Sequence, residues 1–148
     1  MDAMVDYNSD WLWDAVSTEY TAKGVIDRRP KTDEDWKEAR KHAITLLEAS
    51  NLLLMPGRLV ARPGEKSENP EIELEPEDIA RRIHGDVRKW TALAKGLHEA
   101  ASDSLRAIDE RNVKSLFDSG DRLDAACENC HKTYWYPADA AKTPPSRR

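Results

Sequence analysis

The longest apolar stripe of the chain runs from residue 79 to residue 108 and sets the first limit on its fold. Its apolar side chains recur at steps of three and four residues, which is the spacing of one helix face. A proline at residue 76, with two acidic residues behind it, suits a first helical turn. We therefore expect one long helix, which the two glycines within it could bend but do not interrupt. The stripe consists of Ile79, Ile83, Val87, Trp90, Ala94, Leu97, Ala101, Leu105 and Ile108.

Three other segments repeat apolar residues at helical spacing. The first is residues 6–20. The second begins at Thr32, whose hydroxyl suits an N-cap, and ends before Pro56. The last follows a second capping residue, Asn112, and ends at Pro137. The sequence therefore predicts four helices.

The remaining segments are interpreted as connections and a tail. Proline and charge dominate residues 58–75, which we expect to form a surface excursion. No segment alternates in the manner of a strand, so the predicted fold is all-α, an antiparallel up-down-up-down four-helix bundle. We expect it to occupy residues 1–136 as one domain, followed by a flexible tail of proline and basic residues, 137–148.

Composition agrees with a single helical domain. The chain has 148 residues, of which 39% are hydrophobic and 34% charged, with six glycines and one phenylalanine. A formal net charge of −5 argues against nucleic acid as a partner and favours a basic or mixed protein surface. The sequence has neither a polybasic patch nor an apolar stretch long enough to span a membrane, so we expect no membrane insertion.

Both cysteines of the chain lie in one pentapeptide, Cys127-Glu128-Asn129-Cys130-His131. C-x-x-C-H is the spacing of covalent haem attachment, in which each sulfur forms a thioether with a haem vinyl group and the histidine binds the iron. On a helix, residues three and four apart emerge from one face, so one turn can hold a flat macrocycle. The predicted cofactor is therefore haem c, one per chain and covalently attached.

Two other uses of a C-x-x-C pair remain open. It could be a redox dithiol near a βαβ pattern, or half of a zinc site completed by a second C-x-x-C or an H-x-x-x-H. The sequence offers neither companion. His42, His84 and His98 are scattered singly at the borders of apolar stripes, where solvated histidines are the default.

A four-helix pattern with C-x-x-C-H near the C-terminus resembles the class II c-type cytochromes, that is, cytochrome c′ and its low-spin relatives. The resemblance covers about residues 5–136, and its specific part is residues 127–134. It implies that Cys127 and Cys130 attach the haem, that His131 is the proximal iron ligand and that Tyr134 is the aromatic residue that often follows. It also implies that the first helix faces the other side of the iron.

The sixth iron ligand decides between two functions. We expect Met4 in this position, because it lies seven residues before Trp11 on a continued helical face. Met55 is a weaker candidate, and Met1 is read as an initiator. Large apolar side chains should form the walls of a haem pocket, although each could equally belong to the helix core. The candidate walls are Trp11, Leu12 and Trp90, and Arg58 could pair with a haem propionate.

Histidine and methionine together give an iron suited to electron transfer, whereas an open face binds small gases. We expect a non-catalytic electron carrier, because the sequence shows no nucleophile, base pair or phosphate loop of an enzyme. It would exchange electrons with a redox partner protein outside the cytoplasm, in the periplasm, where thioether attachment takes place. The alternatives are a gas-binding protein for NO or CO and a haem module of a larger redox complex. The family resemblance also implies a homodimer through the first two helices, with Trp13 or Trp36 in its interface.

Overall fold

The computed structural model describes residues 1–137, except for the side chain of Asp2. Most of these residues are helical, which confirms the coarse all-α prediction, and they also form one small sheet. The predicted tail lies outside the described residues, apart from Pro137. The elements are η1, a π-helical turn (Asp2–Asp6), α1 (Tyr7–Asp14), β1 (Thr18–Thr21), β2 (Gly24–Asp27), α2 (Asp33–Leu52), α3 (Pro76–Gly85), α4 (Val87–Asp109) and α5 (Val113–Tyr134).

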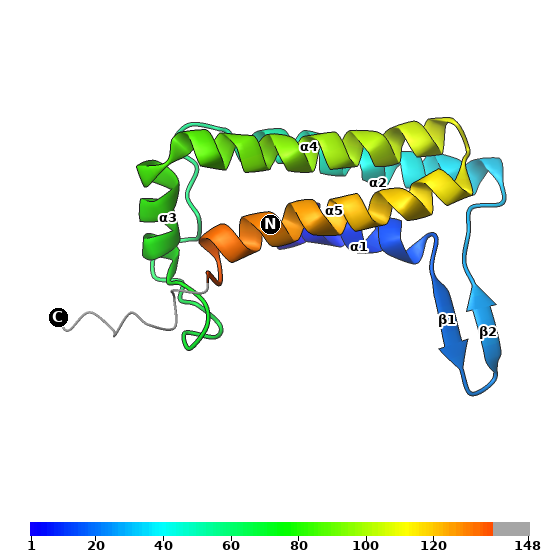
Figure 1. Ribbon diagram of the computed structural model, residues 1–148, viewed down its shortest axis with the longest axis horizontal. Helices are drawn as coiled ribbons and strands as arrows, with labels where there is room; N and C mark the ends of the chain where they lie inside the picture. Colours follow the sequence, from blue (N-terminus) through cyan, green and yellow to red (C-terminus); the bar gives the residue numbers. More distant parts are fainter. Residues whose placement is uncertain (138–148) are drawn as a thin grey trace.

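Helix α4 is the centre of the helix packing. It lies along both α2 and α5, and α1 packs against α2 and α5 (Figure 1). Alanines such as Ala39, Ala43 and Ala101 have no exposed surface, so the helices can approach closely. Leu46 and Leu123 fill the space between them. The core is thus formed by residues of α1, α2, α4 and α5, and α4 contacts both α2 and α5.

Both predicted N-caps are present. The Thr32 hydroxyl accepts a hydrogen bond from the backbone N–H of Asp35 at 3.1 Å, and the Asp35 carboxylate accepts one from the Thr32 N–H at 2.9 Å. The Asn112 side chain accepts a hydrogen bond from the Ser115 N–H at 3.0 Å. These local bonds fix the first turns of α2 and α5, because they satisfy N–H groups that have no partner within the helix.

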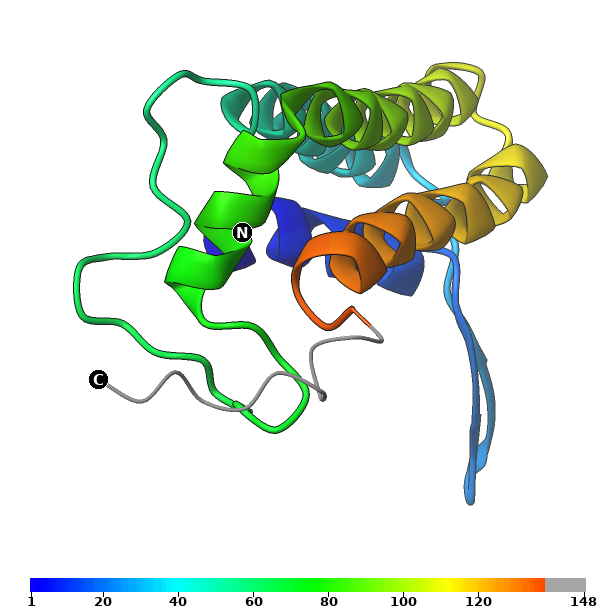
Figure 2. The same cartoon turned by 60° about the vertical axis from the view of Figure 1, so that its left-hand side comes forward.

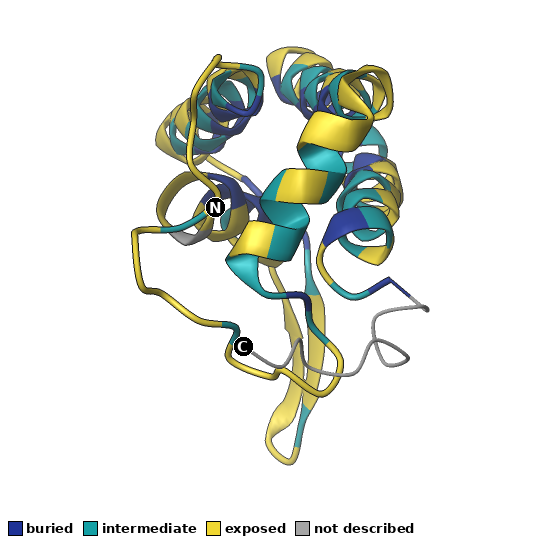
Figure 3. Ribbon diagram, turned by 90° about the vertical axis from the view of Figure 1, so that its left-hand side faces the viewer, coloured by how far each residue is buried: buried dark blue, intermediate teal, exposed yellow. Residues whose placement is uncertain are grey.

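The predicted third helix is in fact two helices, and this part of the prediction was wrong. Asp86 leaves the helical conformation (φ −145°, ψ 74°), and its carboxylate accepts a hydrogen bond from the Lys89 N–H at 2.9 Å, which caps α4. Glycine at residue 85 weakens the helix just before this cap. Helix α3 therefore crosses the end of α4 and α5 and has no buried residue (Figure 3). Val87 is exposed, and the stripe enters the core only from Ala94 onwards.

The first predicted helix is shorter than expected, and a β-hairpin follows it. Helix α1 ends at Asp14, and β1 and β2 pair antiparallel with Tyr20 opposite Val25. Gly24 has φ +129°, a conformation that other residues rarely adopt, and it closes the turn. Threonine, tyrosine, valine and isoleucine favour strands, so local preference wins here over helical spacing. The hairpin projects away from the helices (Figures 1 and 2).

Residues 58–75 contain neither helix nor strand, as expected for a surface excursion. Their end is fixed to the C-terminus of α5, because the Leu74 N–H donates to the Trp135 carbonyl at 2.8 Å and the Leu74 side chain is buried. The segment and α3 thus border the end of α5 that carries the two cysteines. Within residues 1–137, none of the helices combines the length and apolar character required to cross a bilayer.

Candidate functional site

The last turns of α5 bring both cysteines and the motif histidine to one narrow pocket. Its other walls come from α4, from the end of α2 and from the N-terminus, and they are apolar. The pocket holds about 20 Å³, room for roughly one water molecule. It is lined by Met1, Leu53, Trp90, Leu93, Ala94, Leu97, Ala126, Cys127, Cys130 and His131.

The two thiols are free and half-buried. Burial raises the pKa of each thiol to about 11, and the nearby Asp124 carboxylate adds to the shift at Cys127. Both cysteines are therefore uncharged thiols at neutral pH. Redox-active dithiols and zinc ligands need the opposite environment, which lowers the pKa and favours the thiolate. This burial does not favour a redox-active dithiol.

The His131 ring has three neighbours, one on α5 and two just after the end of that helix. Its Nδ1 atom lies 3.7 Å from the Glu128 carboxylate. The Trp135 ring meets it edge-on at a centroid distance of 5.0 Å, and the Tyr136 ring lies at 5.8 Å. Because Nδ1 faces a carboxylate while the ring also lines the pocket, the imidazole has one side for Glu128 and one for a ligand.

Glu128 is itself fixed, and sequence reasoning missed it. Its carboxylate accepts a hydrogen bond from the Tyr136 hydroxyl and pairs with Lys132 at 3.0 Å. These two contacts lower the pKa of Glu128, so it is ionised beside the imidazole. Burial and the same hydrogen bond raise the pKa of Tyr136 to about 12. The available signal was the spacing, since Glu128 lies one helical turn before His131.

Two residues that the sequence assigned to the haem site, Trp90 on α4 and Tyr134 on α5, pack against each other. The Trp90 indole lines the pocket and donates to the Leu53 carbonyl at 2.8 Å. Tyr134 packs edge-on against Trp90 with centroids 5.2 Å apart. Its hydroxyl is buried and has no hydrogen-bond partner among the described residues. A buried hydroxyl without a partner costs about 1–3 kcal/mol, so this group has capacity to bind something more.

Three other predicted residues are not part of the pocket. The Trp11 ring stacks on His42 at 4.2 Å, Leu12 is buried in the core, and Met4 is 41% exposed. The π-helical turn explains the position of Met4, because it changes the spacing that would have placed Met4 on the face of Trp11. Met1 lines the pocket instead.

The remaining candidates lie apart from the pocket. His42 Nδ1 is 2.7 Å from the Asn8 side-chain oxygen, and burial lowers its pKa. His98 Nδ1 is 3.1 Å from the Ser50 hydroxyl, and Met55 and Arg58 are exposed. In the part of the chain that the structure describes, no three histidine, cysteine, aspartate or glutamate side chains are placed to hold a metal ion.

The donor set fits covalent haem. Two thiols three residues apart and an imidazole next to the second share one apolar pocket. Tyr134, whose buried hydroxyl has no partner among the described residues, packs against Trp90 in the pocket wall. The pocket volume is smaller than the volume of a haem macrocycle, so a bound haem would displace side chains that now fill the pocket. Met1 is the wall best able to move, because it is half-exposed at the chain end.

Comparisons with protein-family models, with curated proteins and with solved structures give no match to this chain.

Proposed function

We propose that this chain is a single-haem c-type cytochrome that carries electrons and is not an enzyme. Cys127 and Cys130 would hold the haem by thioether bonds, and His131 would be an axial ligand of the iron. In this proposal α1, α2, α4 and α5 form the antiparallel four-helix bundle, with the haem on α5. One observation carries it: both thiols and the imidazole line the same apolar pocket between α4 and α5.

The residues around the motif support this proposal. A bound haem would supply an iron that changes its valence by one electron. Trp90, Leu93 and Leu97 would exclude water from it, and Glu128 would orient the His131 ring through Nδ1. The Tyr134 hydroxyl, which has no partner among the described residues, would be able to donate to a polar group of the haem.

The setting of this carrier belongs to the same proposal. We expect it outside the cytoplasm, in the periplasm, with a redox partner protein whose surface is basic or mixed, because the chain carries a net charge of −5. A role as a haem module of a larger redox complex is compatible with the same pocket.

A specific observation favours a second function, the binding of NO or CO. Met4, the predicted sixth ligand, does not line the pocket, and three of the walls opposite α5 are leucines. Leu53, Leu93 and Leu97 offer the iron no donor atom. An iron with one open face would bind a small gas.

Spectra of the chain made in a host that attaches haem c test both functions. We expect red protein whose haem stays with the chain on acid-acetone extraction, and no covalent haem in the double variant Cys127→Ala and Cys130→Ala. Colourless wild-type protein from this host would refute the proposal. The matched control is Ser104→Ala, which alters a hydroxyl of the core outside the pocket.

Carbon monoxide separates the carrier from the gas-binding protein. A ferrous spectrum unchanged by carbon monoxide supports a six-coordinate electron carrier, and rapid stoichiometric binding supports the second function. Met4→Ala adds the ligand test: a change from low-spin to high-spin ferric iron would identify Met4 as the ligand, and an unchanged spectrum would exclude it.

A further inference from the structure

The β-hairpin is a projecting arm that nothing in the described chain covers. Its side chains are almost all exposed, including Tyr20 (82%), Val25 (61%) and Ile26 (42%). An isolated two-stranded hairpin is marginally stable in water, because it has no sheet or helix to pack against. The arm lies at the opposite end of the molecule from the cysteine-bearing end of α5 (Figure 1). The exposed face of the arm is therefore far from the cysteine pocket, and any partner that covers it binds elsewhere on the molecule.

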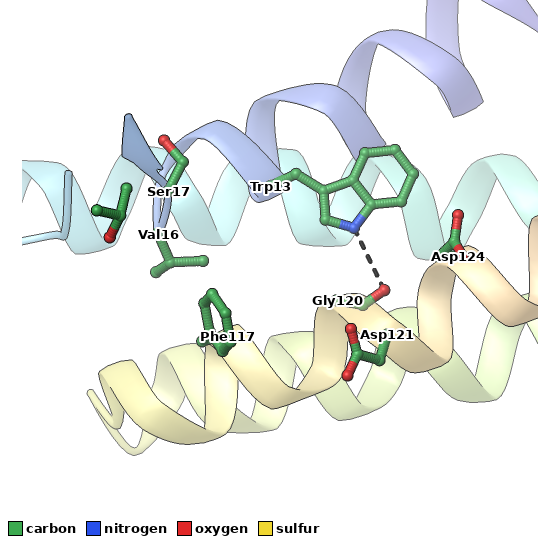
Figure 4. Close-up of a pocket in the computed structure, with 8 residues that line it drawn as sticks. Trp13, Val16, Ser17, Phe117, Gly120, Asp121 and Asp124 are labelled. Atoms are coloured by element: carbon green, nitrogen blue, oxygen red, sulfur yellow. Dashed lines mark hydrogen bonds between the residues drawn. The ribbon is translucent and has the colours of Figure 1, made fainter. Parts of the chain in front are cut away.

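A groove lies at the base of this arm, between the end of α1 and the first half of α5 (Figure 4). It has a volume of about 410 Å³. Trp13 and Phe117 supply its aromatic surface, the Trp13 indole donates to the Gly120 carbonyl at 3.3 Å, and Phe117 is 59% exposed. The groove is lined by Trp13, Val16, Ser17, Thr18, Phe117, Gly120, Asp121 and Asp124.

The groove continues onto one face of the arm. Thr18 lines the groove and is the first residue of β1, so Tyr20, two residues further, lies on the same face of the strand. The register places Val25 opposite Tyr20, which puts this apolar pair on that face. Arm and groove thus form one apolar strip.

The charges of the two parts are complementary. Asp121 and Asp124 are exposed at the groove and have no ion-pair partner among the described residues. On the arm, Arg28 pairs with Glu19 and Arg29 with Asp27, so these charges cancel. Lys23 at the tip has no ion-pair partner within residues 1–137. The arm therefore offers a cation, Lys23, at its tip, and the groove at its base offers aromatic side chains and two carboxylates.

We propose that two copies of this chain form a two-fold symmetric dimer in which the hairpin of each lies along the α1–α5 groove of the other. Because the groove is at the base of the arm, two arms laid antiparallel bring each tip to the partner's groove. A four-residue strand reaches about 13 Å, at about 3.3 Å per residue. The arrangement is isologous and closed, so it stops at two copies.

This interface differs from a dimer through the first two helices, for which Trp36 was a candidate. Trp36 is buried in the core and cannot serve in an interface, whereas Trp13 lies in the groove. The proposed dimer does not involve the cysteine pocket, so it is independent of haem attachment.

Sedimentation velocity of the full chain over a concentration series tests the dimer. We expect wild-type dimers and monomers for the double variant Tyr20→Ser and Val25→Ser. The matched control, Leu59→Ser and Ile72→Ser, removes two apolar side chains that are also more than half exposed, from the surface excursion, and should leave the dimer intact. A wild-type chain that is monomeric throughout the series, or a dimer that survives the arm variant, would overturn the proposal.

Charge exchange tests the pairing of the tip with the groove. Lys23→Glu alone, or Asp121→Lys with Asp124→Lys, places like charges together and should weaken each homodimer by about tenfold or more. A mixture of the two variant chains restores opposite charges at both contacts, so we expect heterodimers by native mass spectrometry. Equal amounts of homodimer and heterodimer in that mixture would show that Lys23 does not meet these aspartates.

Discussion

The middle of the α4–α5 helix pair and its end at the C-terminus of α5 are built differently, although both consist of the same two helices. In the middle, the buried Ser104 and Ser119 hydroxyls lie 2.9 Å apart, and Ser119 also donates to the Leu116 carbonyl at 2.7 Å. At the end, the thiols are half-buried and the Tyr134 hydroxyl has no described partner. In a protein core, buried polar groups normally find hydrogen-bond partners within the protein. The end of this helix pair leaves one such group without a described partner, so it is the part suited to hold a ligand.

The largest expected difference between the two regions is in stability. Leu123→Ala should lower the free energy of unfolding by about 2–5 kcal/mol, because Leu123 is 1% exposed and its loss leaves a cavity. Leu93→Ala, in the wall of the pocket, should cost clearly less, since Leu93 is only half-buried. Urea unfolding of the haem-free chain measures both. Equal losses would mean that the pocket wall is packed as tightly as the core.

The thiols should react slowly in the haem-free folded chain. A pKa raised from 9.0 to about 11 lowers the thiolate fraction at pH 8 by about 100-fold, and the thiolate is the reacting form. Iodoacetamide labelling followed by mass spectrometry measures the rate, with the urea-unfolded chain as control. Similar rates in the two states would contradict the burial of Cys127 and Cys130.

The raised pKa of the two thiols also makes the free energy of unfolding depend on pH. The folded state binds the thiol protons more tightly than the unfolded state, so this contribution is fully present below pH 9. It should be lost as the pH rises from about 9 towards 11, and replacing both cysteines by alanine should remove this alkaline loss.

Two tyrosines at the end of α5 should respond in opposite directions. Tyr134→Phe removes a buried hydroxyl without a described partner and should raise the free energy of unfolding of the haem-free chain by about 1 kcal/mol. Tyr136→Phe removes the hydrogen bond to Glu128 and should lower it by about 1 kcal/mol. Thermal unfolding of each variant measures the sign. Haem attachment should abolish the gain from Tyr134→Phe, and a gain that persists would show that the hydroxyl has no role in the loaded protein.

The smallest effect compares two helical glycines. Gly96→Ala on α4 should raise the free energy of unfolding by about 0.5–1 kcal/mol, because an added Cβ meets nothing within 4 Å. Gly120→Ala on α5 places a Cβ 3.1 Å from Trp13, so the indole must shift and the gain should be lost. Chemical denaturation of both variants measures the difference. A full gain at Gly120 would show that α1 does not pack closely on α5.

Several features were predictable because their causes are local. The caps at Thr32 and Asn112 depend on hydrogen bonds that span three residues, and the structure has both. The cap at Asp86 is equally local, and a glycine followed by aspartate was the signal that the long helix divides there. The hairpin also had a signal, since strand-forming residues flank a turn with Gly24, although the helical spacing of residues 6–20 predicts a helix there.

The position of the proposed ligands was only partly predictable. Helical spacing alone places Cys127, Cys130 and His131 on one face, and the structure brings them to one pocket. Trp90 was expected there and lies there, whereas Trp11 and Met4 do not. Their placement depends on how α1 and η1 pack on α2, which no pattern within a single segment encodes.

By itself the sequence determined α2 and α5, their caps and the spacing of the pentapeptide, because these follow from interactions between residues a few positions apart. Only the tertiary structure decided which side chains form the pocket, that Glu128 faces the His131 ring, and that a hairpin extends beyond an aromatic groove. Such relations join residues from different helices, or depend on which side chains packing leaves exposed, and those are set by the shape of the whole fold.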